Sequence, residues 1–207
     1  MIVKRIARKG ERYVKIEFLD GETLTVAKEI ALDRGLRAND VLTEEEREDL
    51  RLENDRFLVR SSAYRALARR PHLKAELRRK LRQKRFDEGI IEETLEDLDR
   101  RGYLNDEEFA ERYFEERALG KQMGAKKIAQ ELLAKGASRE TVERAASAYP
   151  EKDQLERAVA LGERKLARLA GEKDPLMRKA KLSQFLYGKG YDYDTIGEAL
   201  HRLGFDD

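Results

Sequence analysis

Apolar and polar residues alternate with the period of a β-strand in the first part of the chain. Residues 14–18 (Val-Lys-Ile-Glu-Phe) place apolar side chains at every second position, which predicts a strand buried on one face. Asp20-Gly21 follows, a dipeptide that favours a tight hairpin turn, and residues 23–26 alternate again as the return strand. Residues 2–6 are a candidate for a third strand.

Two helices are expected after this hairpin. Residues 28–34 are predicted to form a short helix that ends at Gly35. Thr43 and Glu46 have the spacing of a capping box and predict the start of a second helix. We therefore interpret residues 1–57 as a small N-terminal module that contains a β-hairpin.

From residue 61 onward the apolar positions follow a helical period, and one pattern occurs three times. Each copy has an apolar pair four residues apart, a lysine, a helix-ending position, an N-cap residue and a β-branched residue. The copies are offset by 51 and 54 residues. In chain order the positions are Leu77, Leu81, Lys84, Arg85, Asp87 and Ile91; Ile128, Leu132, Lys135, Gly136, Ser138 and Val142; and Leu182, Leu186, Lys189, Gly190, Asp192 and Ile196.

A further helix is predicted before each copy, so that one repeat contains three helices. These preceding helices are expected over residues 61–70, 106–119 and 153–170. A single repeat cannot bury its apolar face alone, and stacked neighbours share a core. The predicted fold is mainly α, with three tandem three-helix repeats in an elongated, curved array after the N-terminal module. We place the repeats at residues 58–104, 105–150 and 151–207.

Composition narrows the chemistry that is expected of this chain. It has no cysteine, which excludes disulfides and thiolate metal sites, and only two histidines, His72 and His201. We expect His72 at the surface or in a helix cap, because no serine or aspartate is placed to form a catalytic triad with it. The acidic residues 87–99 are predicted to form a solvated helix face rather than a metal site. No catalytic residue, metal or cofactor is therefore expected.

Charge is strongly segregated, although the net charge is only +2. Residues 61–86 hold ten basic residues and one acidic residue, whereas residues 87–120 hold four basic and thirteen acidic residues. On a helix predicted over residues 73–86, basic side chains lie beside the leucine stripe at three- and four-residue spacings. The residues alone leave two interpretations open: an acidic partner binds this face, or the acidic helix 88–101 neutralises it within the fold.

Several segments of the helical region follow the pattern of one known family. They are residues 66–71 (Ala-Leu-Ala-Arg-Arg-Pro), residues 76–81 (Glu-Leu-Arg-Arg-Lys-Leu) with Phe86, and residues 101–110 (Arg-Gly-Tyr-Leu-Asn-Asp-Glu-Glu-Phe-Ala). Together they resemble the first repeat of the RecX family and its connector to the second repeat. Residues 124–136 continue the resemblance, which is looser in the third repeat. The N-terminal module is missing from the shorter members of that family.

The resemblance implies a non-enzymatic regulator that binds filaments of the RecA recombinase on DNA. Such a regulator restrains strand exchange, ATP hydrolysis and coprotease activity, in DNA repair, DNA recombination and the SOS response. Carried over by position, the candidate contact residues are Arg69, Arg70, Lys74, Arg78, Arg79, Arg82 and Arg85 of the first repeat and Lys121, Lys126 and Lys127 of the second. Reversing Arg78, Arg82 and Arg85 to Glu is expected to abolish inhibition and to leave the fold intact.

Two other functions are compatible with the same basic face. In one, the arginines contact DNA phosphates directly, without RecA; in the other, the chain is a helical scaffold for a different acidic protein. No apolar run reaches membrane-spanning length and no signal-peptide pattern is present, so we expect a cytoplasmic protein with no membrane partner. We also expect a monomer.

Overall fold

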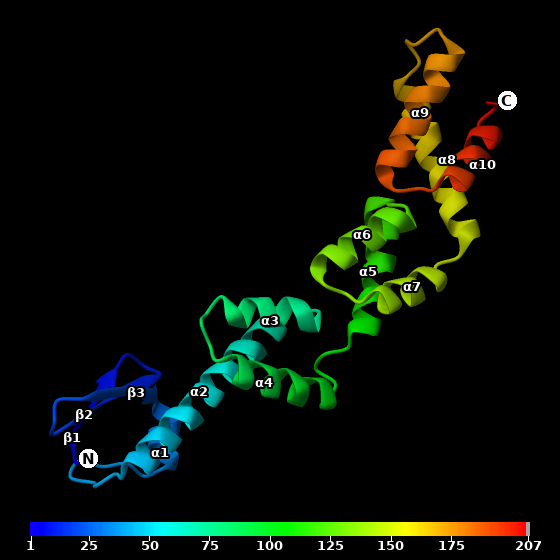
Figure 1. The fold of residues 1–207 in the computed structure, drawn as a ribbon. Helices are drawn as coiled ribbons and strands as arrows, with labels where there is room; N and C mark the ends of the chain where they lie inside the picture. Colours follow the sequence, from blue (N-terminus) through cyan, green and yellow to red (C-terminus); the bar gives the residue numbers. More distant parts are fainter. Residues whose placement is uncertain (206–207) are drawn as a thin grey trace. The chain divides into compact units, whose positions relative to one another are not determined.

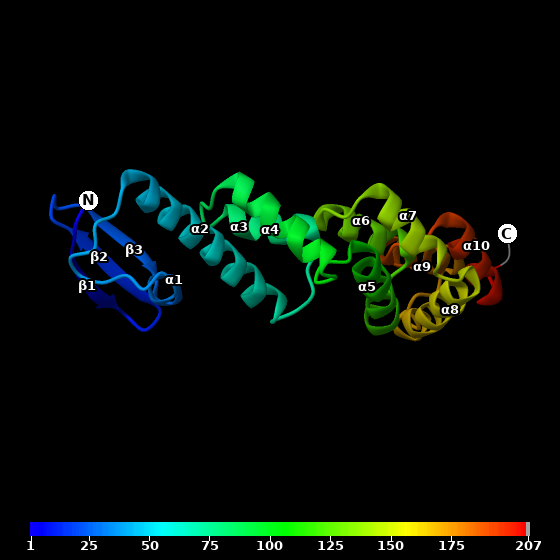
Figure 2. The same cartoon turned by 90° about the horizontal axis from the view of Figure 1, so that it is seen from below.

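The computed structural model describes residues 1–205, which contain three strands and ten helices. The chain divides into two compact units by its internal contacts. The first comprises residues 1–71 and 77–104, and the second comprises residues 72–76 and those from 105 onward. Figure 1 and Figure 2 show the helices and strands of each unit. No helix within this described part is long and apolar enough to cross a membrane.

The first unit begins with an antiparallel sheet of order β1-β2-β3 (Val3–Lys9, Tyr13–Phe18 and Thr23–Ala27), followed by the short helix α1 (Lys28–Asp33). The predicted hairpin and the candidate third strand are thereby confirmed. Gly21, in the turn between β2 and β3, has φ +91°, a left-handed value that glycine adopts at low cost. The buried residues of this module include Val3, Ile16, Phe18, Val26, Ile30 and Leu50.

Helix α2 (Glu44–Leu67) runs without interruption from the N-terminal module into the first repeat (Figure 1). The predicted capping box is present: the Glu46 backbone N–H donates to Thr43 at 3.1 Å, and the Thr43 N–H donates to the Glu46 carboxylate at 2.8 Å. The expectation that a separate helix begins near residue 61 is wrong. Residues 44–67 contain neither glycine nor proline, so nothing in the sequence ends the helix before Pro71.

The first repeat is completed by α3 (Lys74–Arg82) and α4 (Glu88–Arg100). The Asp87 carboxylate caps α4 as predicted, since it accepts a hydrogen bond from the Ile90 backbone N–H at 3.1 Å. Helix α3 is shorter than the predicted helix 73–86, because the chain turns before Arg85, which has a left-handed φ of +60°. The core of the repeat includes Val59, Ala63, Leu77, Leu81, Ile91, Leu95 and Leu98.

The second unit contains the second and third repeats. Helices α5 (Asp106–Lys121), α6 (Ala125–Lys135) and α7 (Arg139–Ser147) form the second repeat. Helices α8 (Glu151–Arg168), α9 (Pro175–Lys189) and α10 (Tyr193–Arg202) form the third. The predicted N-caps Ser138 and Asp192 are confirmed, because their side chains accept hydrogen bonds from the backbone N–H groups of Thr141 and Thr195 at 3.0 and 2.7 Å.

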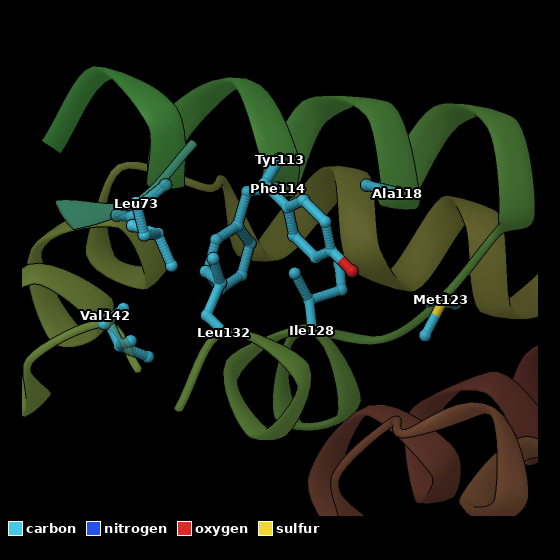
Figure 3. Packing of buried hydrophobic residues seen from close by; sticks show 11 residues of the cluster. Leu73, Tyr113, Phe114, Ala118, Met123, Ile128, Leu132 and Val142 are labelled. Atoms are coloured by element: carbon cyan, nitrogen blue, oxygen red, sulfur yellow. The ribbon is translucent and has the colours of Figure 1, made fainter. Parts of the chain in front are cut away.

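Large side chains from different helices fill the core of the second repeat (Figure 3). Tyr113 and Phe114 of α5 lie over Ile128 and Leu132 of α6. Leu73, which precedes α3, belongs to the same cluster and is fully buried. The first turn of α3 is therefore anchored in the second repeat, in agreement with the assignment of residues 72–76 to the second unit.

The turn after the second helix of each repeat contains a residue with a left-handed backbone in all three copies. Arg85, Gly136 and Gly190 have φ values of +60°, +101° and +92°. A Cβ at Gly190 would lie 2.7 Å from the backbone nitrogen of Lys127, so glycine is required there by packing as well as by conformation. The recurrence of this backbone shows that the sequence repeat is also a structural repeat.

The mainly α fold predicted from the sequence, with three three-helix repeats after a small sheet, is confirmed. The apolar positions of the repeat are buried in all three copies, among them Leu77, Leu81, Ile91, Leu132, Val142, Leu186 and Ile196, and Leu95 of α4 is buried with them. The elongated, curved arrangement of the repeats stays a prediction.

Truncation of a core leucine provides a test of this packing. Leu132→Ala is expected to lower the free energy of unfolding by about 2–5 kcal/mol, because a fully buried leucine leaves a cavity when it is shortened. Leu133→Ala removes the same atoms from the next position, which is 43% exposed, and is expected to cost less than about 1 kcal/mol. Urea denaturation of both variants measures the difference. Equal losses would mean that α6 buries a different face.

Candidate partner-binding surface

Helix α3 buries its leucines and keeps its cations closer to the surface. Leu77 and Leu81 are buried in the core of the first repeat, and Arg78 and Arg82 each follow one of them directly, which places the arginines beside the core. Among the candidate contact residues of this repeat, the partly buried ones are Lys74 and Arg78, and the exposed ones are Arg69, Arg70, Arg79, Arg82 and Arg85.

Two of these arginines form ion pairs with the acidic helix α4. The Arg78 guanidinium donates two hydrogen bonds to Glu92, from Nη2 at 2.7 Å and from Nε at 2.5 Å. Arg82 Nε donates to both carboxylate oxygens of Glu88, at 2.8 and 2.9 Å. These hydrogen bonds raise the pKa of Arg78 and Arg82, and the bond from Arg82 lowers the pKa of Glu88. Both pairs are therefore ionised at neutral pH.

Carboxylates of α4 therefore neutralise part of the basic charge of the first repeat. Glu93 of α4 adds an ion pair with Arg56 of α2 at 3.2 Å, so α4 contacts cations of both neighbouring helices. Reversing Arg78 and Arg82 to Glu would place like charges against Glu92 and Glu88. This geometry does not support the expectation that such a reversal leaves the fold intact. The four-residue spacing of the two glutamates, matching that of the two arginines, is the sequence signal for these pairs.

The remaining cations of the first repeat lie around its turns. Arg69 follows the end of α2, and Arg85 lies in the turn between α3 and α4. The Arg70 guanidinium donates to the Pro71 carbonyl at 2.9 Å, and the Lys74 backbone N–H donates to Asp106 Oδ1 at 2.8 Å. Arg69 and Arg85 are therefore the exposed positions at which a charge can be changed with the least effect on the core.

The three lysines of the second repeat differ in their surroundings. Lys121 is exposed at the end of α5. Lys126 Nζ lies 5.7 Å from the centroid of the Tyr187 ring, and Lys127 Nζ donates to the Gly188 carbonyl at 2.9 Å. A cation is favourable at that position, because the carbonyls in the last turn of a helix carry partial negative charge. Lys126 and Lys127 thus connect the second repeat to the third, a role that their sequence positions did not indicate.

One part of the expectation for His72 is wrong: the residue is only 3% exposed and does not lie at the surface. It directly precedes the buried Leu73, which holds the start of α3 against the second repeat. Within residues 1–205, no group of three or more histidine, aspartate or glutamate side chains is placed to hold a metal ion.

Comparisons with known proteins assign this architecture to a family. Family models of the first, second and third three-helix domains of RecX match residues 60–98, 105–145 and 151–200, which together are more than half of the chain. The chain belongs to the RecX family. Each match falls on one of the three repeats, including the third, in which the RecX resemblance of the sequence was looser.

Two relatives in the RecX family align over nearly the whole chain, and a third aligns over about two thirds of it. The Regulatory protein RecX of Clostridium perfringens is 30% identical over 203 residues, which are 98% of this chain and 93% of the relative. That of Clostridium acetobutylicum is 31% identical over 208 residues, which cover 98% and 95%. The RecX protein of Chlorobium phaeobacteroides is 33% identical over 141 residues, 68% of this chain and 90% of its own length.

Solved RecX structures have a similar fold. A crystal structure of regulatory protein RecX has a TM-score of 0.71 at 20% identity and covers 95% of this chain and 97% of its own. The crystal structure of RecX from Lactobacillus salivarius has a TM-score of 0.70 at 28% identity and covers 74% and 99%. RecX is a family of regulatory proteins, and the fold described above is that of its members.

A double-mutant cycle provides a test of the pair between Arg78 and Glu92. Arg78→Ala, Glu92→Ala and the double variant are expected to give a coupling energy of about 0.5–1 kcal/mol, since the pair is bidentate but partly solvated. The exposed pair Arg112–Glu108 of α5 is the reference, and its coupling should be smaller. Urea denaturation in low salt measures both. A coupling no larger than that of the reference would show that α4 does not hold Arg78 in solution.

Proposed function

We propose that this chain binds filaments of the RecA recombinase on DNA and restrains strand exchange, ATP hydrolysis and coprotease activity. It acts in the cytoplasm, without an active site of its own, in the control of DNA repair, recombination and the SOS response. Membership in a family of regulatory proteins supports the proposal. The observation that carries it is the charge of residues 61–86, which hold ten basic residues and one acidic residue and lie within the match to the first RecX domain.

An acidic partner surface suits the cations of the first repeat. Because Arg78 and Arg82 already have carboxylate partners, an acidic partner that binds them replaces Glu92 and Glu88. Such an exchange substitutes one ion pair for another, and therefore contributes more to specificity and association rate than to affinity. The net attraction then depends on cations outside these two pairs, among them Arg69 and Arg85.

DNA-dependent ATP hydrolysis by RecA, measured with and without this chain, provides the first test. Unmodified protein is expected to inhibit hydrolysis, and Arg69→Glu with Arg85→Glu should raise the concentration needed for half inhibition about tenfold, since four units of charge change on the contact face. The control changes the same charge at exposed arginines elsewhere, Arg37→Glu with Arg139→Glu. If both double variants lose inhibition equally, the first repeat is not the contact.

Binding to naked DNA distinguishes the alternatives. Equal affinity for bare and RecA-coated DNA would favour direct DNA binding, and its logarithmic salt slope on single strands should fall by roughly 0.7 per cation removed. Binding to neither form would favour a scaffold for another acidic protein. A clear preference for coated DNA is the result expected of a RecA regulator.

Removing the internal carboxylates should have the opposite effect to removing the arginines. Glu88→Gln with Glu92→Gln leaves Arg82 and Arg78 without these ion pairs, so the affinity for RecA-coated DNA is expected to rise by roughly twofold to tenfold. The control is Glu96→Gln with Glu143→Gln, two exposed glutamates with the same total charge. Fluorescence anisotropy of labelled, RecA-coated DNA measures the change. Unchanged affinity in a less stable protein would show that these pairs act only in folding.

A further inference from the structure

The N-terminal module and α2 enclose a groove of about 700 Å³ within the first unit. Its lining combines cations with aromatic rings: Arg12, Tyr13, Lys28, Phe57, Tyr64 and Arg65. We propose that this groove binds a segment of single-stranded nucleic acid, with its phosphates on the cations and its bases against the rings. The site is separate from the arginines of α3 and does not depend on binding of RecA.

Backbone pairing brings two cations of the groove together. The Lys28 N–H donates to the Arg12 carbonyl at 2.9 Å, directly beyond the last pair of the β2–β3 ladder, Tyr13 and Ala27. Within the part of the chain that the structure describes, neither the Arg12 guanidinium nor the Lys28 amine forms an ion pair with a carboxylate. Like charges at paired backbone positions repel each other, and an anion bound between them relieves the repulsion. A phosphate group is such an anion.

The groove is organised before any ligand binds. Asn54 of α2 is 4% exposed, and its Oδ1 accepts a hydrogen bond from the Ala27 N–H at 2.8 Å, which ties the end of β3 to α2. The third cation, Arg65, donates from Nε to the Ser61 carbonyl at 3.0 Å. This bond directs the guanidinium along its own helix. A ligand therefore meets cations whose supporting backbone is already fixed, which reduces the entropy lost on binding.

The aromatic rings favour nucleic acid over an acidic peptide. Tyr13, Phe57 and Tyr64 are only partly buried. The Tyr64 ring packs edge-to-face against Tyr103, with ring centroids 5.4 Å apart and ring planes at 85°. Surfaces that bind single strands combine cations for the backbone with rings on which bases stack. Glu11 and Glu29 also line the groove, so charge alone gives a modest attraction and stacking must supply part of the affinity.

The strand that leads into the groove extends its positive surface. Residues 4–15, which span most of β1, the turn and the start of β2, hold six basic residues and one acidic residue; two of the basic residues, Arg5 and Lys15, form ion pairs with Glu17. Arg8 and Lys9 are exposed near this turn. Nucleic acid is attracted to such a surface over about 8–10 Å at physiological salt, and the hairpin therefore guides a strand toward the groove.

Binding of a fluorescein-labelled, twelve-nucleotide oligo(dT) by the full chain, without RecA, tests the site. Arg12→Gln with Lys28→Gln is expected to weaken binding about tenfold and to lower the logarithmic salt slope by about 1.4, at roughly 0.7 per charge. The control, Arg37→Gln with Arg60→Gln, removes two exposed charges outside the groove and should change the affinity less than about twofold. Equal weakening by both double variants, or no binding by the unmodified chain, would overturn the proposal.

Substitutions of Tyr13 test the contribution of base stacking separately from that of charge. Tyr13→Ala should weaken oligo(dT) binding about fivefold or more, whereas Tyr13→Phe keeps the ring and the affinity. An abasic oligomer of the same length should bind more weakly than oligo(dT) and should not respond to Tyr13→Ala. Thermal unfolding midpoints check that the variants are folded. Equal affinity for both oligomers, or equally tight binding of a poly-glutamate peptide that is lost in Arg12→Gln with Lys28→Gln, would assign the groove to an acidic protein instead.

Discussion

Burial of one apolar pair in each repeat is the constraint on which the rest of the helical region depends. Helices α3 and α6 have only 9 and 11 residues, lengths at which an isolated helix is marginal in water. They persist because Leu81 and Leu132 are buried in clusters that include residues of the helix that follows. A left-handed residue and a capped N-terminus bring that next helix back onto the apolar pair, and this device recurs in all three repeats.

The same constraint creates the charged face. With Leu77 and Leu81 turned into the core, Arg78 and Arg82 must lie at its edge, where the carboxylates of α4 reach them. Since the ion pairs already balance part of the charge, the first repeat tolerates its basic residues without a partner. A partner with acidic groups then competes with an internal helix, which favours selective binding over indiscriminate attraction to every anion.

Helix α2 has a double role in the first unit. Its first half contributes Leu50 and the buried Asn54 to the N-terminal module, and its second half contributes Val59 and Ala63 to the first repeat. One uninterrupted helix therefore contributes residues to two cores and connects the module rigidly to the first repeat. The groove lined by the module and α2 follows from this arrangement, and it gives the module a surface of its own, separate from the arginines of α3.

The sequence by itself determined the features that depend on neighbouring residues: the alternating strands, the capping box at Thr43, the N-cap at Asp87 and the threefold period of buried positions. These are local because hydrogen bonds within a turn and side-chain periodicity involve residues only a few positions apart. Only the tertiary structure decided that Arg78 and Arg82 meet carboxylates of α4 and that the Lys127 amine binds a carbonyl of α9. The matching four-residue spacings of the arginines and glutamates allow the α3–α4 pairs but do not select them, because packing decides which of many exposed charges come within hydrogen-bonding distance.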